Sequence, residues 1–320
     1  MAKYLVTGGA GFIGSNITEA LIKQGDQVRV FDNLSTGKKE NLDCVAGKAE
    51  LFEGDIRDRE ALAKAMAGVD YVLHLAALRA VLRSVDDPEE TNDVNVRGTL
   101  NVLLAARDAK VKRVVSTSSS SIYGDTEKFP LAETEIPNPL SPYAASKIMG
   151  EYYCKIFTKL YGLETVSLRY FNVFGPRQNP ESVYSAVIPI FIDCILKGKS
   201  PEIHWDGKQS RDFSYVDNVV VANILAATTP GVAGEAFNIA CHEEYSVMDI
   251  FTNLKEILNI HNIEPIFKPK RAGDIRRTYA DISKSERMLG FKVQTRFREG
   301  LEKTVKWFLE SGVFSAKTAV

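Results

Sequence analysis

Cysteine is scarce in this chain of 320 residues, and its four cysteines are far apart. They form neither a Cys-x-x-Cys motif nor a His–Cys cluster, so we expect no disulfide framework and no metal site. The cysteines are Cys44, Cys154, Cys194 and Cys241. Such scattered residues are typical of reduced thiols in a cytoplasmic protein.

A strong charge of either sign is also absent. The formal net charge is −1, so nothing favours binding to nucleic acid or to an anionic membrane. No apolar run approaches the roughly 20 residues that a membrane span needs. Met1 to Lys3 lead directly into an apolar segment, so we expect no signal peptide. The length allows one large α/β unit or two closely packed lobes.

What the sequence does contain begins with a glycine-rich turn. A short apolar segment predicts a buried parallel strand, and Gly8, Gly11 and Gly14 follow it at intervals of three. In such turns the glycines allow a tight bend, a close approach to pyrophosphate and helix packing, while the helix N-terminus offers N–H groups. The next predicted strand ends at Asp32, where a carboxylate would bind an adenosine ribose and repel a 2′-phosphate. The pattern predicts a site for NAD rather than NADP.

Strands and helices alternate in the first half of the chain, which predicts a Rossmann fold, a doubly wound parallel sheet of the α/β class. The expected strands there are 3–7, 27–31, 51–53, 71–75, 113–117 and 164–169, and the helices are 58–66, 91–109 and 143–160. Later strands are expected at 202–205 and 236–239, and helices at 185–197, 217–228, 246–258 and 297–309. We predict an NAD-binding domain over 1–172 and a smaller, interleaved C-terminal α/β substrate lobe over 173–320.

One predicted helix carries Tyr143 and Lys147, four residues apart and therefore on one face. An ammonium group there would favour the phenolate and lower the pKa of the tyrosine. A base of that kind can remove a proton from a sugar hydroxyl. The Tyr-x-x-x-Lys spacing alone is common on solvated helices, so its significance comes from the dinucleotide turn and from the serine run 118–121 that precede it.

Eight segments together resemble the extended short-chain dehydrogenase/reductase family, and most closely its UDP-sugar 4-epimerases. They include Asn-Val-Arg-Gly-Thr and Arg-Tyr-Phe-Asn, and their positions are 7–14, 74–77, 95–99, 119–124, 143–147, 169–172, 211–213 and 271–274. The resemblance implies tightly bound NAD that is regenerated in each turnover, and a UDP-sugar substrate. It also implies a homodimer built by a four-helix bundle from helices 91–109 and 143–160.

The resemblance also implies a mechanism. Ser119 would hydrogen-bond the 4-hydroxyl of the sugar, Tyr143 would take its proton, and Lys147 would hold the cofactor ribose. A 4-keto sugar would then rotate and regain the hydride on its other face. Related dehydratases carry acids where this chain has Ser120 and Ser121, so the serines leave only the chemistry of an epimerase. The expected NAD-binding residues are Gly8, Gly11, Phe12, Ile13, Asp32, Asn33, Asp55, Ile56, Leu75, Ala76, Ala77, Tyr143 and Lys147.

For the substrate, the resemblance implies diphosphate binding by Arg211 and Arg271, and ribose binding by Asp274. Small Thr278 at a gate position, together with Gln178, favours UDP-GlcNAc and UDP-GalNAc, with UDP-Glc and UDP-Gal also accepted. The full expected set is Arg79, Ser119, Asn172, Gln178, Ala186, Val187, Arg211, Arg271, Asp274 and Thr278.

Arg79 departs from the pattern of the N-acetyl-preferring epimerases, which have a small residue there. It could pair with the diphosphate, point outward, or face an acidic sugar such as UDP-glucuronate. The resemblance argues against the acidic sugar, since glucuronate epimerases carry an arginine where this chain has Asn179. A UDP-glucuronate 4-epimerase is therefore only the alternative to the N-acetylhexosamine prediction, followed by a protein that only senses a dinucleotide without catalysis.

Overall fold

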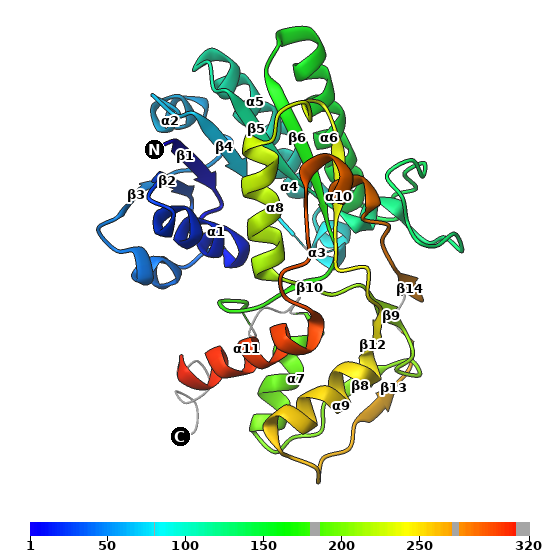
Figure 1. Ribbon diagram of the computed structural model, residues 1–320. Coiled ribbons are helices and arrows are strands. Elements are labelled where there is room, and N and C mark those ends of the chain that lie inside the picture. Colours follow the sequence, from blue (N-terminus) through cyan, green and yellow to red (C-terminus); the bar gives the residue numbers. More distant parts are fainter. Residues whose placement is uncertain (80, 180–185, 271–274, 312–320) are drawn as a thin grey trace.

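The computed structural model describes residues 1–79, 81–179, 186–270 and 275–311, and a seven-stranded sheet lies at its centre (Figure 1). The strand order is β11-β6-β5-β4-β1-β2-β3, and every neighbouring pair is parallel. The strands are β1 (Lys3–Thr7), β2 (Gln27–Asp32), β3 (Ala49–Glu53), β4 (Tyr71–His74), β5 (Arg113–Ser119), β6 (Glu164–Tyr170) and β11 (Ala236–Ile239). Because the chain winds outward from β1 in both directions, the predicted doubly wound fold is confirmed.

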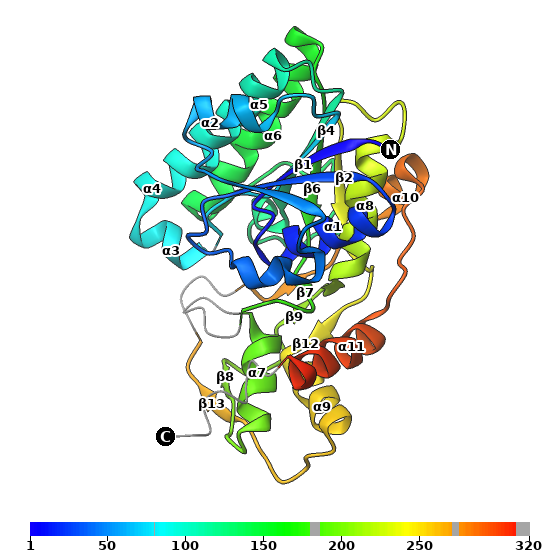
Figure 2. The same ribbon diagram turned by 90° about the vertical axis from the view of Figure 1, so that its left-hand side faces the viewer.

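Helices cover both faces of this sheet (Figures 1 and 2). Tyr4 and Val6 point into the core on one face and Leu5 into the core on the other, so the strands are apolar on both sides. The first face carries α1 (Phe12–Lys23), the 3₁₀ helix η1 (Lys39–Val45), α8 (Val216–Thr228) and α10 (Ser283–Leu289). The second carries α2 (Arg59–Ala65), α5 (Gly98–Asp108) and α6 (Pro142–Tyr161).

The predicted helix 91–109 is not a single regular helix. It consists of α4 (Pro88–Asn92), a π-helical turn η2 (Asp93–Arg97) and α5, and α3 (Val81–Asp86) precedes it. A π turn is rare and often marks a functional site. Here it presents Asn95, which exchanges hydrogen bonds of 2.8 and 2.9 Å with the backbone of Leu78 and donates to Ser146 Oγ. The loop after β4 is thereby held against α6.

The C-terminal lobe has a separate core rich in phenylalanine, including Phe174, Phe191 and Phe251. It lies below the central sheet in both views (Figures 1 and 2). Its helices are α7 (Val187–Leu196), α9 (Val247–Leu258) and α11 (Phe297–Glu310). Its short strands are β7 (Val173–Phe174), β8 (Glu202–His204), β9 (Ser210–Arg211), β10 (Ser214–Tyr215), β12 (Tyr245–Ser246), β13 (Ile266–Lys268) and β14 (Arg277–Thr278).

The two parts of the chain are interleaved. After building part of the lobe, the chain returns to the central sheet as α8 and β11, and then as α10. β11 pairs with β6, so the sheet is completed by a strand from beyond residue 172. Over the described residues, no helix has the length and apolarity that crossing a bilayer requires.

Candidate functional site

A cleft of about 1830 Å³ runs along the carboxyl ends of the central strands and continues toward the C-terminal lobe. Pockets for a single small ligand usually measure roughly 300–1,000 Å³, so this one has room for two nucleotide-sized ligands. Most of the site residues expected from the sequence line it: Gly8, Gly11, Phe12, Ile13, Asp32, Asn33, Asp55, Ile56, Leu75, Ala76, Ala77, Arg79, Ser119, Tyr143, Lys147, Asn172, Gln178, Arg211 and Thr278.

Four expected substrate residues are not placed in the cleft. Ala186 and Val187 are absent from its lining in the described part of the chain. Val187 is the first residue of α7, is half-buried, and packs against the phenylalanine-rich core of the lobe. Arg271 and Asp274 lie outside the described residues.

The glycine turn between β1 and α1 has the geometry of a pyrophosphate cradle. Gly8 has φ +70°, and a Cβ there would lie 2.7 Å from the backbone nitrogen of Ala76. A Cβ on Gly14 would lie 2.2 Å from the carbonyl oxygen of Gly8, so α1 can pack this closely only on a glycine. Gly11 caps α1 without a side-chain hydrogen bond, which suits binding of an anion by the N–H groups of the first turn. These residues fit the pyrophosphate of NAD.

Asp32 is held at the end of β2 by the backbone around it. Its Oδ2 accepts a hydrogen bond from Ala10 N–H at 3.0 Å, and its Oδ1 accepts one from Leu34 N–H at 2.8 Å. Burial raises the pKa of Asp32, and the two N–H donors oppose that rise. The carboxylate borders the cleft beside the glycine turn, where it fits the adenosine ribose.

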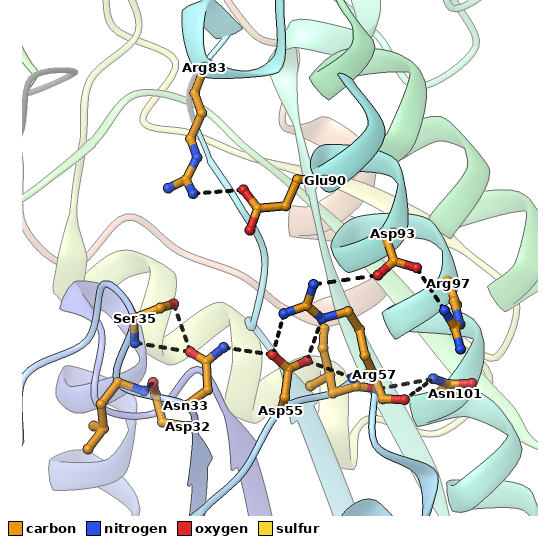
Figure 3. Close-up of polar contacts among 12 residues, drawn as sticks. Asp32, Asn33, Ser35, Asp55, Arg57, Arg83, Glu90, Asp93, Arg97 and Asn101 are labelled. Carbon is orange, nitrogen blue, oxygen red and sulfur yellow. Dashed lines mark hydrogen bonds and ion pairs between the residues drawn. The ribbon is translucent and has the colours of Figure 1, made fainter. Parts of the chain in front are cut away.

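Asp55 is fixed by an arginine that the sequence analysis did not identify (Figure 3). Arg57 donates to both carboxylate oxygens, at 3.0 and 2.7 Å, and Asn33 donates to Oδ2 at 2.9 Å. The Arg57 hydrogen bonds lower the pKa of Asp55 to about 2. Arg57 also reaches Asp93 on η2 at 3.5 Å, which links this end of the cleft to the π turn. No sequence motif marks Arg57, and the second of its two acidic partners, Asp93, is distant along the chain.

The first turn of α6 brings Tyr143 to the end of β5. Ser141 Oγ caps the helix by accepting from Ala144 N–H at 3.1 Å. Ser119 and Tyr143 both line the cleft, and the Ser119 hydroxyl lies close enough to lower the pKa of Tyr143. Lys147 Nζ lies 5.8 Å from the centre of the Tyr143 ring and donates to the carbonyl oxygen of Thr117 at 3.1 Å. The structure therefore brings the serine, tyrosine and lysine of the expected mechanism together.

The pKa of Tyr143 departs from the sequence expectation. Burial raises it, while the Ser119 hydrogen bond and the positive charge of Arg79 oppose the rise. Burial also lowers the pKa of Lys147 to about 8. The expected lowering of the Tyr143 pKa by Lys147 is therefore not seen in this structure, because desolvation outweighs the neighbouring charges.

Ser121 joins the site through Ser119. In the 3₁₀ turn η3 (Ser120–Tyr123), Ser121 donates to Ser119 Oγ from its backbone N–H at 3.2 Å and from its hydroxyl at 3.0 Å. With two donors on its oxygen, Ser119 has its own proton free to donate to Tyr143. The serine run in the sequence indicated that this segment belongs to the site. Which serine donates to which depends on the 3₁₀ turn that the segment forms.

His74, in contrast, has a structural role. Its ring is buried between the hydroxyls of Thr7 and Thr99, at 2.7 and 3.0 Å. Burial, with a smaller contribution from the positive charge of Lys147, lowers the pKa of His74 to about 3. The ring is therefore neutral at physiological pH.

The lobe contributes polar groups to the other end of the cleft. Arg211 and Thr278 are cross-strand neighbours in β9 and β14, and Arg211 Nη2 donates to the carbonyl oxygen of Ile275 at 2.6 Å. Asn172 has φ +30° and donates to Thr278 Oγ1 at 3.3 Å. Gln178 is 3% exposed and donates to the carbonyl oxygen of Val173 at 3.2 Å; its own Oε1 has no partner among the described residues.

Arg79 lines the same cleft as Tyr143 and Lys147. Its surface borders the open cleft, yet desolvation by the surrounding protein lowers its pKa, and Tyr143 is the group that opposes this lowering. No carboxylate in the described part of the chain forms an ion pair with it. Arg79 keeps an exposed surface and its charge acts on Tyr143, so this placement agrees with each of the three expectations for Arg79.

Known proteins match this chain over nearly its whole length. The model of the "NAD dependent epimerase/dehydratase family" matches residues 4–240. The chain belongs to this family. A putative UDP-glucose 4-epimerase of Methanocaldococcus jannaschii is 42% identical over 305 residues, which cover 95% of this chain and 97% of that protein.

Solved structures agree with the fold. The UDP-N-acetylglucosamine 4-epimerase from Methanobrevibacter ruminantium, in complex with UDP-N-acetylmuramic acid, is 42% identical with a TM-score of 0.92, covering 97% of this chain and 99% of that one. The Thermus thermophilus UDP-glucose 4-epimerase, in complex with NAD, is 36% identical with a TM-score of 0.87, covering 96% and 99%. These matches confirm the predicted family, and the cofactor of this enzyme is NAD.

Proposed function

We propose that this enzyme interconverts the C4 epimers of a UDP-sugar. The observation that supports this most directly is the placement of Ser119, Tyr143 and Lys147 on one cleft, with Lys147 Nζ 5.8 Å from the centre of the Tyr143 ring. This cleft is large enough for both NAD and a nucleotide sugar. Serines stand at 120 and 121, so the acids that a dehydratase uses there are missing. A catalytic role also fits this arrangement better than a purely dinucleotide-sensing one.

In the proposed mechanism Tyr143 takes the proton of the sugar 4-hydroxyl and later returns it. Ser119 orients that hydroxyl, and the positive charges of Lys147 and Arg79 stabilise the phenolate as it forms. Bound NAD would supply the hydride acceptor and donor. Asp32 and the glycine turn would hold its adenosine and pyrophosphate, and Lys147 its nicotinamide ribose. The lobe, residues 173–320, would anchor the UDP moiety while the 4-keto sugar rotates to present its other face.

The preferred substrates of this proposal are UDP-GlcNAc and UDP-GalNAc, with UDP-Glc and UDP-Gal also accepted. Gln178 supports this preference, since its nitrogen donates to the carbonyl oxygen of Val173 and its buried oxygen has no partner among the residues that the structure describes. The N–H of a 2-acetamido group can supply that donor, whereas a buried acceptor without a donor would be costly. Thr278, a small residue that also lines the cleft, leaves space for the 2-acetamido group.

The first test is incubation of the purified enzyme with UDP-GlcNAc, UDP-Glc and UDP-glucuronate separately, without added NAD, with products followed by proton NMR. The proposal expects the 4-epimer from UDP-GlcNAc and at least a 1,000-fold lower rate in Tyr143→Phe, since the base is lost. Gln178→Leu should reduce the preference for UDP-GlcNAc over UDP-Glc by about 10-fold. No conversion of any sugar, even with NAD added, would contradict the proposed function.

A second candidate, a 4-epimerase of an acidic UDP-sugar such as UDP-glucuronate, is supported by Arg79. A guanidinium beside Tyr143, with no ion pair among the described residues, could bind a carboxylate on the sugar. The Methanobrevibacter relative was solved with UDP-N-acetylmuramic acid, itself an acidic sugar nucleotide. This candidate predicts that Arg79→Met raises KM for UDP-glucuronate at least 10-fold and leaves KM for UDP-GlcNAc within about two-fold. An equal change in KM for both sugars would contradict this candidate and would indicate that Arg79 stabilises the Tyr143 phenolate instead.

We further propose a homodimer through α5 and α6. α6 exposes Met149, Tyr152, Ile156 and Leu160 at helical spacing, so these apolar side chains form one stripe. α5 lies alongside α6 (Figure 1), so two copies can pair as a four-helix bundle. Ile156→Glu should convert the dimer to monomer in multi-angle light scattering, whereas Lys306→Glu on α11 should not. A monomeric parent enzyme would exclude the proposal.

A further inference from the structure

One ionisable side chain on the face of α6 that carries Tyr143 and Lys147 has no part in the mechanism above. Glu151 follows Lys147 by one helical turn, and its Oε1 accepts a hydrogen bond from Ser118 Oγ at 2.5 Å. Ser118 is buried and directly precedes Ser119 in β5. The contact therefore joins α6 to the residue next to the proposed catalytic serine.

Arg169 completes this contact from the neighbouring strand. It pairs with Ser118 in the register of β5 and β6, and donates to Glu151 from Nε at 2.9 Å and from Nη2 at 2.8 Å. Its Nη1 donates to Tyr123 OH at 2.8 Å. The side chains of Arg169 and Glu151 are only 7% and 11% exposed, so this is a buried, two-pronged ion pair.

A buried ion pair of this kind contributes little net stability, because desolvation offsets much of its attraction. It does restrict geometry, since each group has directional partners. Glu151 spans the ends of β5 and β6, and Lys147 donates to the carbonyl oxygen of Thr117. Two successive residues of β5, Thr117 and Ser118, are thus attached to two successive turns of α6, and Ser119 follows them near Tyr143 of the preceding turn.

We propose that Glu151 and Ser118 are positioning residues, which set the separation of Ser119 from Tyr143 by clamping the end of β5 to α6. The proposal rests on the proposed epimerase function. Without the Ser118 hydroxyl, β5 is no longer attached to Glu151 next to Ser119, so Ser119 can drift from Tyr143. Errors near 1 Å between reacting groups can lower rates by about 100-fold, so partial drift is expected to lower kcat.

The test compares Ser118→Ala with Ser116→Ala. Ser116 is also a buried serine of β5, two residues earlier and so on the same face, where it lies close enough to Cys154 of α6 to lower the pKa of that thiol. Both variants remove one buried hydroxyl under the same helix, and both should lose similar thermal stability. Ser118→Ala should lower kcat at least 10-fold with KM within about two-fold, whereas Ser116→Ala should keep kcat within about two-fold. Crystal structures should show a longer Ser119–Tyr143 distance only in Ser118→Ala.

Two further measurements separate the alternatives. The pH dependence of kcat should keep its shape in Ser118→Ala, because the clamp acts through position; a shifted profile would assign Glu151 an electrostatic role and overturn the proposal. Equal kcat in the two serine variants would also overturn it. If Ser118→Ala does not fold, Glu151→Gln, which weakens the pairing with Arg169, is compared with Ser116→Ala in the same way. A wild-type enzyme inactive on every UDP-sugar would refute the epimerase function, while the crystallographic distances would still test the clamp.

Discussion

Acidification should destabilise the fold through His74, which the core holds as a neutral ring. Burial lowers the pKa of His74 from 6.5 to about 3, so between these values the unfolded chain binds a proton that the native protein does not. The stability that this group contributes is therefore complete above pH 6.5 and is lost progressively as the pH falls toward 3. At pH 5.0 the loss is (6.5 − 5.0) × ~1.4 kcal/mol, or about 2 kcal/mol.

The perturbation is His74→Gln, which cannot titrate but can still hydrogen-bond Thr7 and Thr99. We expect the variant to be less stable than the parent at pH 7, because a ring that fills the core is lost. Its further loss between pH 7.0 and 5.0 should be smaller than that of the parent by about 2 kcal/mol. The assay is urea unfolding at both pH values, at the same saturating NAD concentration.

The control is His261→Gln, since His261 is exposed and its replacement should leave the pH-dependent loss unchanged. The other titrating groups are common to parent and variants, so they cancel in the comparison. Equal losses between pH 7.0 and 5.0 in the parent and in His74→Gln would refute the assignment of a neutral, desolvated histidine.

Two more predictions concern the cofactor end of the cleft. Gly14→Ala should lower NAD affinity at least 10-fold in calorimetry, because its Cβ would lie 2.2 Å from the carbonyl oxygen of Gly8. Its control is Gly150→Ala in α6, where the nearest atom is 3.9 Å away; this change should leave NAD affinity unaltered and stabilise the helix by up to ~1 kcal/mol. Arg57→Ala should raise the pKa of Asp55 from about 2 toward its ordinary value and weaken NAD binding about 5-fold, and unchanged affinity would show that Asp55 does not contact the cofactor.

The nucleotide-binding half of the fold could be predicted because its signals are local. An apolar strand followed by Gly8, Gly11 and Gly14 predicts a strand, a tight turn and a helix, and β1 and α1 occupy those segments. Tyr143 and Lys147 could be paired from spacing alone, since one helical turn separates them. β11 could be predicted as a strand, but its place beside β6 follows from chain topology, which no local pattern contains.

Other properties of the site escaped prediction because the environment that produces them is made by distant segments. The substrate-binding role expected of Val187 stays a prediction, and its side chain also packs on the lobe core. The pKa of Tyr143 was expected to fall, but burial by the assembled cleft raises it. Glu151 acquires its partners Ser118 and Arg169 from two strands, and Arg57, which holds the nearby Asp55, gains Asp93 as a second partner from η2.

By itself the sequence determined the fold class and the NAD cofactor, because both depend on the spacing of residues within one strand, turn or helix. The reacting groups stay a prediction that rests on the resemblance to the UDP-sugar 4-epimerases. Tertiary structure alone decided which acids are held by arginines, how far burial shifts each pKa, and which hydroxyl orients Ser119. Those properties depend on desolvation and on contacts across strands, and both arise only when segments far apart in the chain exclude water together.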